Sequence, residues 1–189
     1  MSTHSLVFRL TCPAVQANVH TLLEEIKLRD ATLASAFCRV PKSCIVLLNL
    51  SIPSPQAESD VIYLFGKIMS TYYRRYFERQ PPLLFFHGLE QSRCARGERI
   101  CARVRVGGGD ALSRCLGEMK EAFERVSGVS ATVSESWYLP LMNVALPSDL
   151  LAEEGERHFG AQRADSVQLV NLRRLTHKGF YRVEAEVAV

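Results

Sequence analysis

Three arginines have the spacing that most directly suggests chemistry in this chain of 189 residues. Arg99, Arg103 and Arg105 lie four and two residues apart, so they share one face of any strand that runs through this segment. Each guanidinium can make bidentate contacts with phosphate oxygens, and a row of them can follow a polyanion. The alternative is a hydrated strand face whose charges Glu90 and Glu98 balance.

Aromatic residues allow a second route to nucleic-acid contact. Residues 72–79 interleave aromatic and basic side chains, which suits stacking on bases but is also typical of the last turns of an amphipathic helix. Trp137, the only tryptophan, is either a core residue or a groove residue on which a base stacks. Residues 107–109 are three glycines, but no Gly-Lys-Ser/Thr ending follows them, so they indicate a turn rather than a phosphate loop.

Groups for acid–base or metal chemistry are scarce. No metal-ligand spacing and no Ser-His-Asp arrangement is visible, so we expect no metal and no cofactor. None of the five histidines has Ser or Thr two residues later. His87, at the end of a predicted strand, is the best candidate for a ligand-binding histidine, and the alternative is a structural role.

Composition indicates an ordinary globular protein. Hydrophobic residues make up 47% and the net charge is +3, which neither requires nor excludes a polyanionic partner. The six cysteines lack Cys-x-x-Cys spacing and suit a reducing compartment, cytoplasmic or nuclear. No apolar run reaches the roughly 18–20 residues of a membrane helix, so we expect no membrane partner.

Periodicity predicts the elements that position these residues. Strands are predicted at 6–12, 44–50, 83–86, 100–106, 137–146, 166–175 and 180–189, and helices at 13–36, 59–77 and 110–126. A polar loop is predicted at 90–98, and a polar connection, with at most a helical turn, at 149–163. This order predicts an α+β fold in which two antiparallel sheets face one another.

The element order and several short segments resemble the A-kinase anchoring protein 7 branch of the two-histidine phosphoesterases. The matching segments are Ser43-Cys44-Ile45-Val46-Leu47, Phe86-His87-Gly88-Leu89, Pro140-Leu141-Met142-Asn143-Val144 and Phe159-Gly160. The resemblance covers nearly the whole chain. It implies a single two-lobed, LigT-like domain over residues 1–189, with a central groove between two sheets and helices packed outside.

In that superfamily two facing strands each carry a His-x-Thr or His-x-Ser motif. The resemblance implies that one histidine acts as general base and the other as general acid on a phosphodiester or a 2′,3′-cyclic phosphate. Carried onto this chain, the histidine positions become Cys44 and Leu141, and the hydroxyl positions become Val46 and Asn143. Both catalytic histidines are therefore missing.

The register of the second motif is open by one residue. A shift would place Pro140 and Met142 in the groove instead of Leu141 and Asn143. We prefer Leu141 and Asn143, because that register turns Met142 toward the core. Neither register supplies a histidine.

The resemblance with both motifs lost predicts a catalytically degenerate protein that binds a nucleotide or an RNA phosphate. The expected ligand-binding residues are Asn143, His87, Arg99, Arg103, Arg105 and Trp137. One alternative is a protein-interaction module without a small ligand, which apolar groove residues such as Val46 favour. The other is an active phosphodiesterase with displaced groups such as Cys44 and His87. Kinase anchoring is not expected, since the chain ends in a strand without an amphipathic tail.

Overall fold

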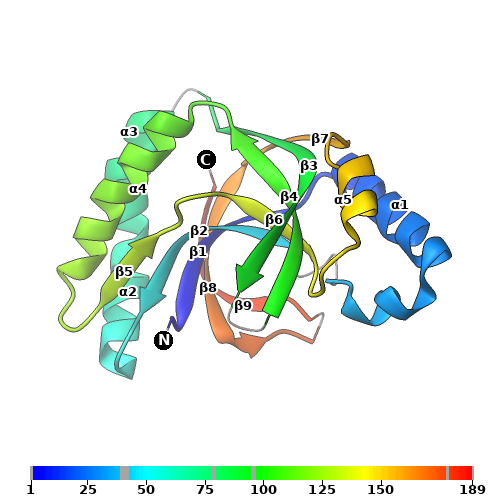
Figure 1. Ribbon diagram of the computed structural model, residues 1–189. Coiled ribbons are helices and arrows are strands. Elements are labelled where there is room, and N and C mark those ends of the chain that lie inside the picture. The colour runs from blue at the N-terminus through cyan, green and yellow to red at the C-terminus, as the bar shows by residue number, and fades with distance from the viewer. Residues whose placement is uncertain (1, 39–42, 78–79, 95–96, 178, 189) are drawn as a thin grey trace.

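The computed structural model describes residues 2–38, 43–77, 80–94, 97–177 and 179–188 (Figure 1). The helices are α1 (Pro13–Arg29), η1 (Ala31–Ala36), α2 (Pro55–Ile68), η3 (Met69–Tyr73), α3 (Arg74–Phe77), α4 (Gly109–Glu124) and α5 (Ser148–Glu153). The strands are β1 (His4–Arg9), β2 (Cys44–Ser51), β3 (Leu83–Cys94), β4 (Gly97–Val106), β5 (Ser130–Val133), β6 (Tyr138–Met142), β7 (His158–Arg163), β8 (Ser166–Leu175) and β9 (Tyr181–Ala188).

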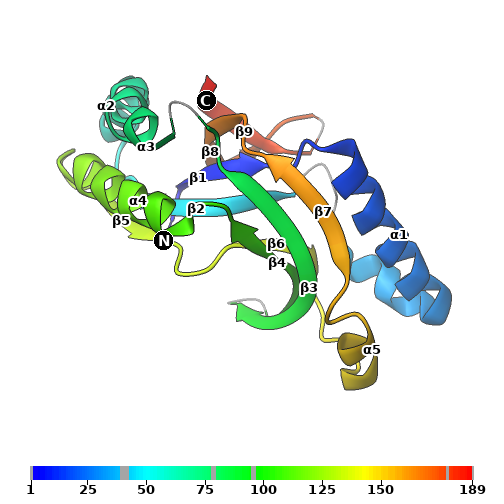
Figure 2. The ribbon, with the colours of Figure 1, turned by 90° about the horizontal axis from the view of Figure 1, so that it is seen from above.

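The strands form two antiparallel sheets. The first has the order β5-β2-β1-β8-β9 and the second the order β6-β4-β3-β7. Helices α2 and α4 pack against the five-stranded sheet, and α1 lies along β7 of the other sheet (Figure 2). The expected α+β fold, with helices outside two antiparallel sheets, is therefore confirmed.

Local signals explain where the helices begin and end. Pro13 occupies the first turn of α1, where its missing N–H costs no hydrogen bond. The Ser54 hydroxyl caps α2 by accepting from the Ala57 N–H, so this helix begins earlier than predicted. Asp30 ends α1 and caps η1, which divides the predicted helix at 13–36 into two. A π-turn, η3, likewise interrupts the helix predicted at 59–77.

The predicted polar loop at 90–98 is wrong. Strands β3 and β4 continue as an antiparallel ribbon, in which Glu90 pairs with Cys101 and Arg93 with Glu98. A two-stranded ribbon can hydrate both faces, so its strands lack the apolar alternation on which the prediction depended.

Strands β5 and β7 were not predicted. β5 has only four residues and gains its hydrogen bonds by pairing with β2. β7 is the edge of the four-stranded sheet, where four of its six residues are exposed, and it pairs with β3. Both depend on a partner strand rather than on a pattern of their own.

The two faces of the five-stranded sheet have different partners. Leu6 and Phe8 of β1 and Ile45 of β2 are buried in the main core. Val7 and Cys44 point to the opposite face and belong to a separate, smaller apolar cluster. This second face of the sheet lines the cavity described below.

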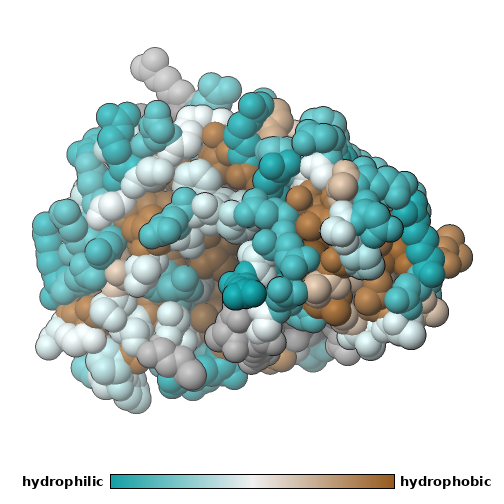
Figure 3. All heavy atoms as spheres, viewed as in Figure 1, coloured by the Kyte–Doolittle hydropathy of each residue, from teal (hydrophilic) through white to brown (hydrophobic). Residues whose placement is uncertain are grey.

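Hydrophilic and hydrophobic residues are interspersed over the face of the molecule shown in Figure 3. No helix in the described part of the chain is long and apolar enough to cross a membrane.

Candidate functional site

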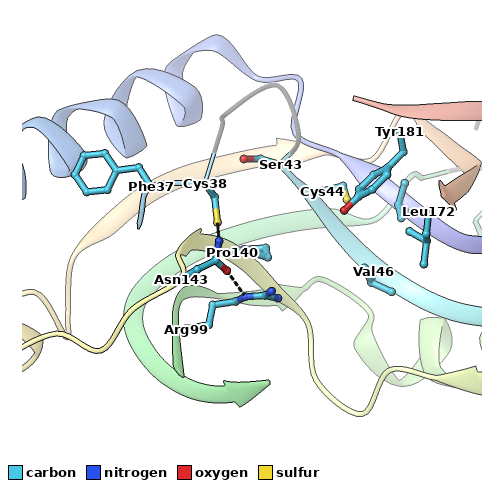
Figure 4. Close-up of a pocket in the computed structure, with 11 residues that line it drawn as sticks. Phe37, Cys38, Ser43, Cys44, Val46, Arg99, Pro140, Asn143, Leu172 and Tyr181 are labelled. Carbon is cyan, nitrogen blue, oxygen red and sulfur yellow. Dashed lines mark hydrogen bonds between the residues drawn. The ribbon is translucent and has the colours of Figure 1, made fainter. Parts of the chain in front are cut away.

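A cavity of about 350 Å³ lies between the two sheets, at the position of the predicted groove (Figure 4). Four strands of one sheet, two strands of the other and the segment that precedes β2 border it. Its lining residues are Val7, Phe37, Cys38, Ser43, Cys44, Val46, Arg99, Pro140, Asn143, Leu172 and Tyr181.

Strand β2 carries Cys44 and Val46, the residues onto which the resemblance places the first motif. Cys44 and Val46 are two residues apart on β2, so both side chains face the cavity. Burial raises the pKa of the Cys44 thiol to about 12, with the charge of Arg9 opposing the shift. The thiol is therefore protonated at neutral pH and cannot act as a general base or as a thiolate nucleophile.

The preferred register of the second motif is wrong for Leu141. Pro140 pairs with Cys101 and Met142 with Ile100, so Leu141 is an extra residue in β6, a bulge. The side chains of both Leu141 and Met142 are buried in the main core. Pro140 takes the groove position instead.

The bulge nevertheless leaves Asn143 in the lining of the cavity. Its backbone N–H donates to the carbonyl of Ala36, which fixes the chain just after β6. Its Nδ2 lies 3.5 Å from Sγ of Cys38, and its Oδ1 accepts from Nε of Arg99 at 3.1 Å. Figure 4 shows Asn143 between the other two side chains.

Arg99 and Cys38 complete the polar side of the cavity. The Asn143 contact is made by Nε, so the terminal nitrogens of Arg99 make no hydrogen bond to the residues that the structure describes. Burial raises the pKa of the Cys38 thiol, opposed by Arg99 and by the contact with Asn143. This wall therefore offers N–H donors and a fixed positive charge, but no group that exchanges a proton near neutral pH.

The remaining predicted site residues lie elsewhere. His87, Arg103, Arg105 and Trp137 all border a separate, shallow hollow on the four-stranded sheet. Arg103 donates to the Gly155 carbonyl at 3.0 Å, and these residues are absent from the lining of the main cavity. The predicted row of arginines is thus divided between two sites.

His87 and Arg105 are close enough to interact electrostatically. Burial lowers the pKa of His87, and the charges of Arg103 and Arg105 lower it further. The Arg105 guanidinium lies 5.2 Å from the centre of the Phe85 ring. Because Cys44 and His87 border different hollows, the geometry does not pair them as a displaced acid and base.

Residues 72–77 of the aromatic and basic segment pack in the manner of a helix end, while 78–79 lie outside the described residues. Tyr73 and Phe77 are buried, with ring centres 4.9 Å apart. Arg75 forms an ion pair with Glu118 of α4. These aromatic rings are core residues rather than a stacking surface for bases.

Sequence reasoning missed the contribution of Phe37, Cys38 and Tyr181. Phe37 forms an isolated bridge with Met142, and the Cys38 N–H donates to the Leu141 carbonyl. Tyr181 arrives from the last hairpin. No short motif marks these positions, and Phe37 and Cys38 reach the cavity only through pairing with the distant strand β6.

No protein-family model and no curated protein matches the sequence. Solved structures do share the fold. E. coli LigT complexed with 3′-AMP is 12% identical, with a TM-score of 0.63 over 100% of this chain and 98% of that one. LigT complexed with ATP is 11% identical, with a TM-score of 0.60 over 100% and 98%. A phosphoesterase crystal structure is 14% identical, also with a TM-score of 0.60 over 100% and 98%.

At this level of identity the likeness establishes the fold alone. The chain has the LigT-like fold in its full extent, since the matches cover nearly all of both chains. The expected fold class is thereby confirmed.

Proposed function

We propose that this protein is a catalytically degenerate member of the two-histidine phosphoesterase superfamily that binds a nucleotide or an RNA phosphate between its two sheets. The observation that carries the proposal is the pairing of Arg99 with Asn143 in the cavity. The pair presents a guanidinium and an amide to the cavity, where the resemblance to the superfamily implies a phosphate site. Charge-assisted hydrogen bonds of this kind are the strong ones for phosphate oxygens.

The loss of catalysis follows from the groups at the motif positions. Cys44 and Pro140 stand where an acid and a base are needed, and neither exchanges a proton near neutral pH. Removing one general acid–base group typically costs about 10²–10⁴-fold in rate. With both replaced, we expect binding without useful turnover.

The apolar side of the cavity supports a nucleotide over a bare phosphate. Val7, Val46 and Leu172 border it opposite the Arg99–Asn143 pair. Ligand sites commonly combine such an apolar wall with a few oriented polar groups. LigT, which shares the fold, has been crystallised with 3′-AMP and with ATP, and this chain is proposed to take ligands of that class.

Calorimetric titration with 3′-AMP tests the proposal. The Arg99→Gln variant removes the charge while keeping a polar side chain, and Arg114→Gln on the exposed face of α4 is the matched control. We expect saturable binding that Arg99→Gln weakens about tenfold or more, since hydrogen bonds to charged groups contribute about 1.5–3 kcal/mol. Equal affinities in both variants would place the ligand elsewhere.

A protein-interaction module is the second candidate. Its supporting observation is that Val46 and Pro140 occupy two of the motif positions with side chains that offer no hydrogen bond to phosphate. Failure of mononucleotides, cyclic nucleotides and short RNAs to raise the melting temperature would favour this candidate, because a ligand that binds only the native state stabilises it.

A further inference from the structure

A cluster outside the cavity joins three elements that are far apart in sequence. His4 of β1, Glu58 in the first turn of α2 and Glu184 of β9 bring one imidazole nitrogen and two carboxylate oxygens within 4.8 Å of one another. We propose that this cluster binds a divalent transition-metal ion such as Zn²⁺. The proposal is independent of the phosphate site, since none of the three residues borders the main cavity.

Glu184 is the residue that points most strongly to a bound cation. Leu169 pairs with Ala185 and Val170 pairs with Val183, so Glu184 is the extra residue of a bulge in β9. A bulge changes the direction in which a side chain points, and the Glu184 side chain is only 7% exposed. Its Oε1 has no hydrogen-bond partner in the described part of the chain. A buried carboxylate oxygen in this state is destabilised by the loss of its hydration unless a cation satisfies it.

His4 presents its second ring nitrogen to the same point. The Thr3 hydroxyl lies 2.9 Å from Nδ1 of His4, and it also contacts the Leu50 carbonyl and the Ile52 N–H. When the Thr3 hydroxyl donates to Leu50, it accepts from Nδ1–H of His4, and Nε2 then carries a lone pair. That lone pair faces Oε1 of Glu58 across 3.2 Å, an arrangement that an intervening cation stabilises.

Each proposed ligand side chain also contacts a second residue of the protein. Besides the Thr3 contact to His4, Nδ2 of Asn171 donates to Oε1 of Glu58 at 3.3 Å. Nε of Arg182 lies 3.4 Å from the other oxygen of Glu184, Oε2. Such outer contacts fix the orientation of ligands in metal sites and are a regular part of their design.

The donor set suits zinc, as does the 3.2 Å between Nε2 of His4 and Oε1 of Glu58. Imidazole and carboxylate are both common zinc ligands, and bonds of about 2.0–2.1 Å in a tetrahedron place ligand atoms about 3.3 Å apart. A hollow of about 170 Å³ bordered by His4, Glu58 and Asn171 gives an entry path. The charge of Arg173 at the same hollow opposes a cation, so binding should depend on both carboxylates.

Co²⁺ is the probe that tests the site, because its absorption spectrum reports the ligand type. The full-length protein is stripped with EDTA and titrated with Co²⁺ under reducing conditions. We expect one ion per chain, visible d–d bands and no thiolate charge-transfer band, followed by displacement with Zn²⁺. Cysteine thiolates bind the same ions and would give a charge-transfer band. The absence of that band therefore assigns the ion to this cluster rather than to the cysteines.

Three Glu→Gln variants locate the ion. Glu184→Gln and Glu58→Gln should each weaken Co²⁺ binding about tenfold or more, and exposed Glu121→Gln on α4 should leave it unchanged. Circular dichroism in EDTA checks folding. If Glu184→Gln does not fold, Glu58→Gln decides, since the Glu58 side chain is 24% exposed. No saturable binding, a thiolate band or affinities equal to that of the Glu121→Gln control would overturn the proposal.

Discussion

Nε of Arg99 donates to Oδ1 of Asn143 across 3.1 Å, and this contact joins strand β4 to the end of β6 inside the cavity. The two side chains come from positions 44 residues apart. Their pairing orients the guanidinium toward the space between the sheets (Figure 4). It also makes the two residues a unit rather than two independent side chains.

A double-mutant cycle should reveal this unit. We expect Asn143→Ala to weaken 3′-AMP binding about tenfold, because it removes one N–H donor and the group that orients Arg99. Combining it with Arg99→Gln should cost less than the sum of the two single losses, since contacting residues are coupled. Calorimetric titration of the four proteins measures the coupling, and strict additivity would show that the pair does not act together.

The bulge in β6 predicts opposite effects for two neighbouring residues. Leu141→Ala should lower the free energy of unfolding by about 2–5 kcal/mol, since it empties a fully buried position. Pro140→Ala should change it little, because Pro140 borders the cavity. Chemical denaturation of both variants makes the comparison. If Pro140→Ala lowered the free energy of unfolding and Leu141→Ala did not, the result would support the register preferred from the sequence.

Cys44 should be inert at neutral pH. Raising the thiol pKa from 9.0 to about 12 lowers the thiolate fraction about a thousandfold. Alkylation by iodoacetamide, followed residue by residue with mass spectrometry, should therefore be slow at Cys44 in the folded protein and fast after unfolding. Rapid modification of folded Cys44 at neutral pH would revive the hypothesis of a displaced nucleophile.

The pKa of His87 should respond to its basic neighbours. Burial and the charges of Arg103 and Arg105 lower it from 6.5, so Arg105→Gln should raise it part of the way back. The contribution of His87 to stability is accordingly present above pH 6.5 and lost as the pH falls through its lowered pKa. Histidine-detected NMR titration of the wild type and of Arg105→Gln measures the shift. An unchanged pKa would show that Arg105 does not contribute to the shift.

Sequence alone could predict the wall of the cavity formed by β2. The apolar run that contains Cys44 and Val46 suits a strand buried on both faces, and residues two apart on a strand share a side. It could not predict the register of β6. The bulge at Leu141 depends on pairing with β4, and single-sequence periodicity carries no information on which residue is left unpaired.

Long-range pairing also explains the other sites that sequence reasoning missed. Cys38 reaches Asn143 only because the segment before β2 bridges to β6. His4, Glu58 and Glu184 form a cluster through sheet order and a second bulge, so no ligand spacing was visible in the sequence. The expectation of no metal followed from short-range motifs alone.

The most direct test of binding without catalysis is ³¹P NMR of 2′,3′-cyclic AMP incubated with the purified protein. The phosphorus resonance reports binding by its shift and linewidth, and hydrolysis by the appearance of a monoester signal. We predict a saturable change in the cyclic phosphate resonance, diminished by Arg99→Gln, with no product formed. Steady conversion to 2′-AMP or 3′-AMP by the wild type, abolished in a variant of the cavity, would contradict the account.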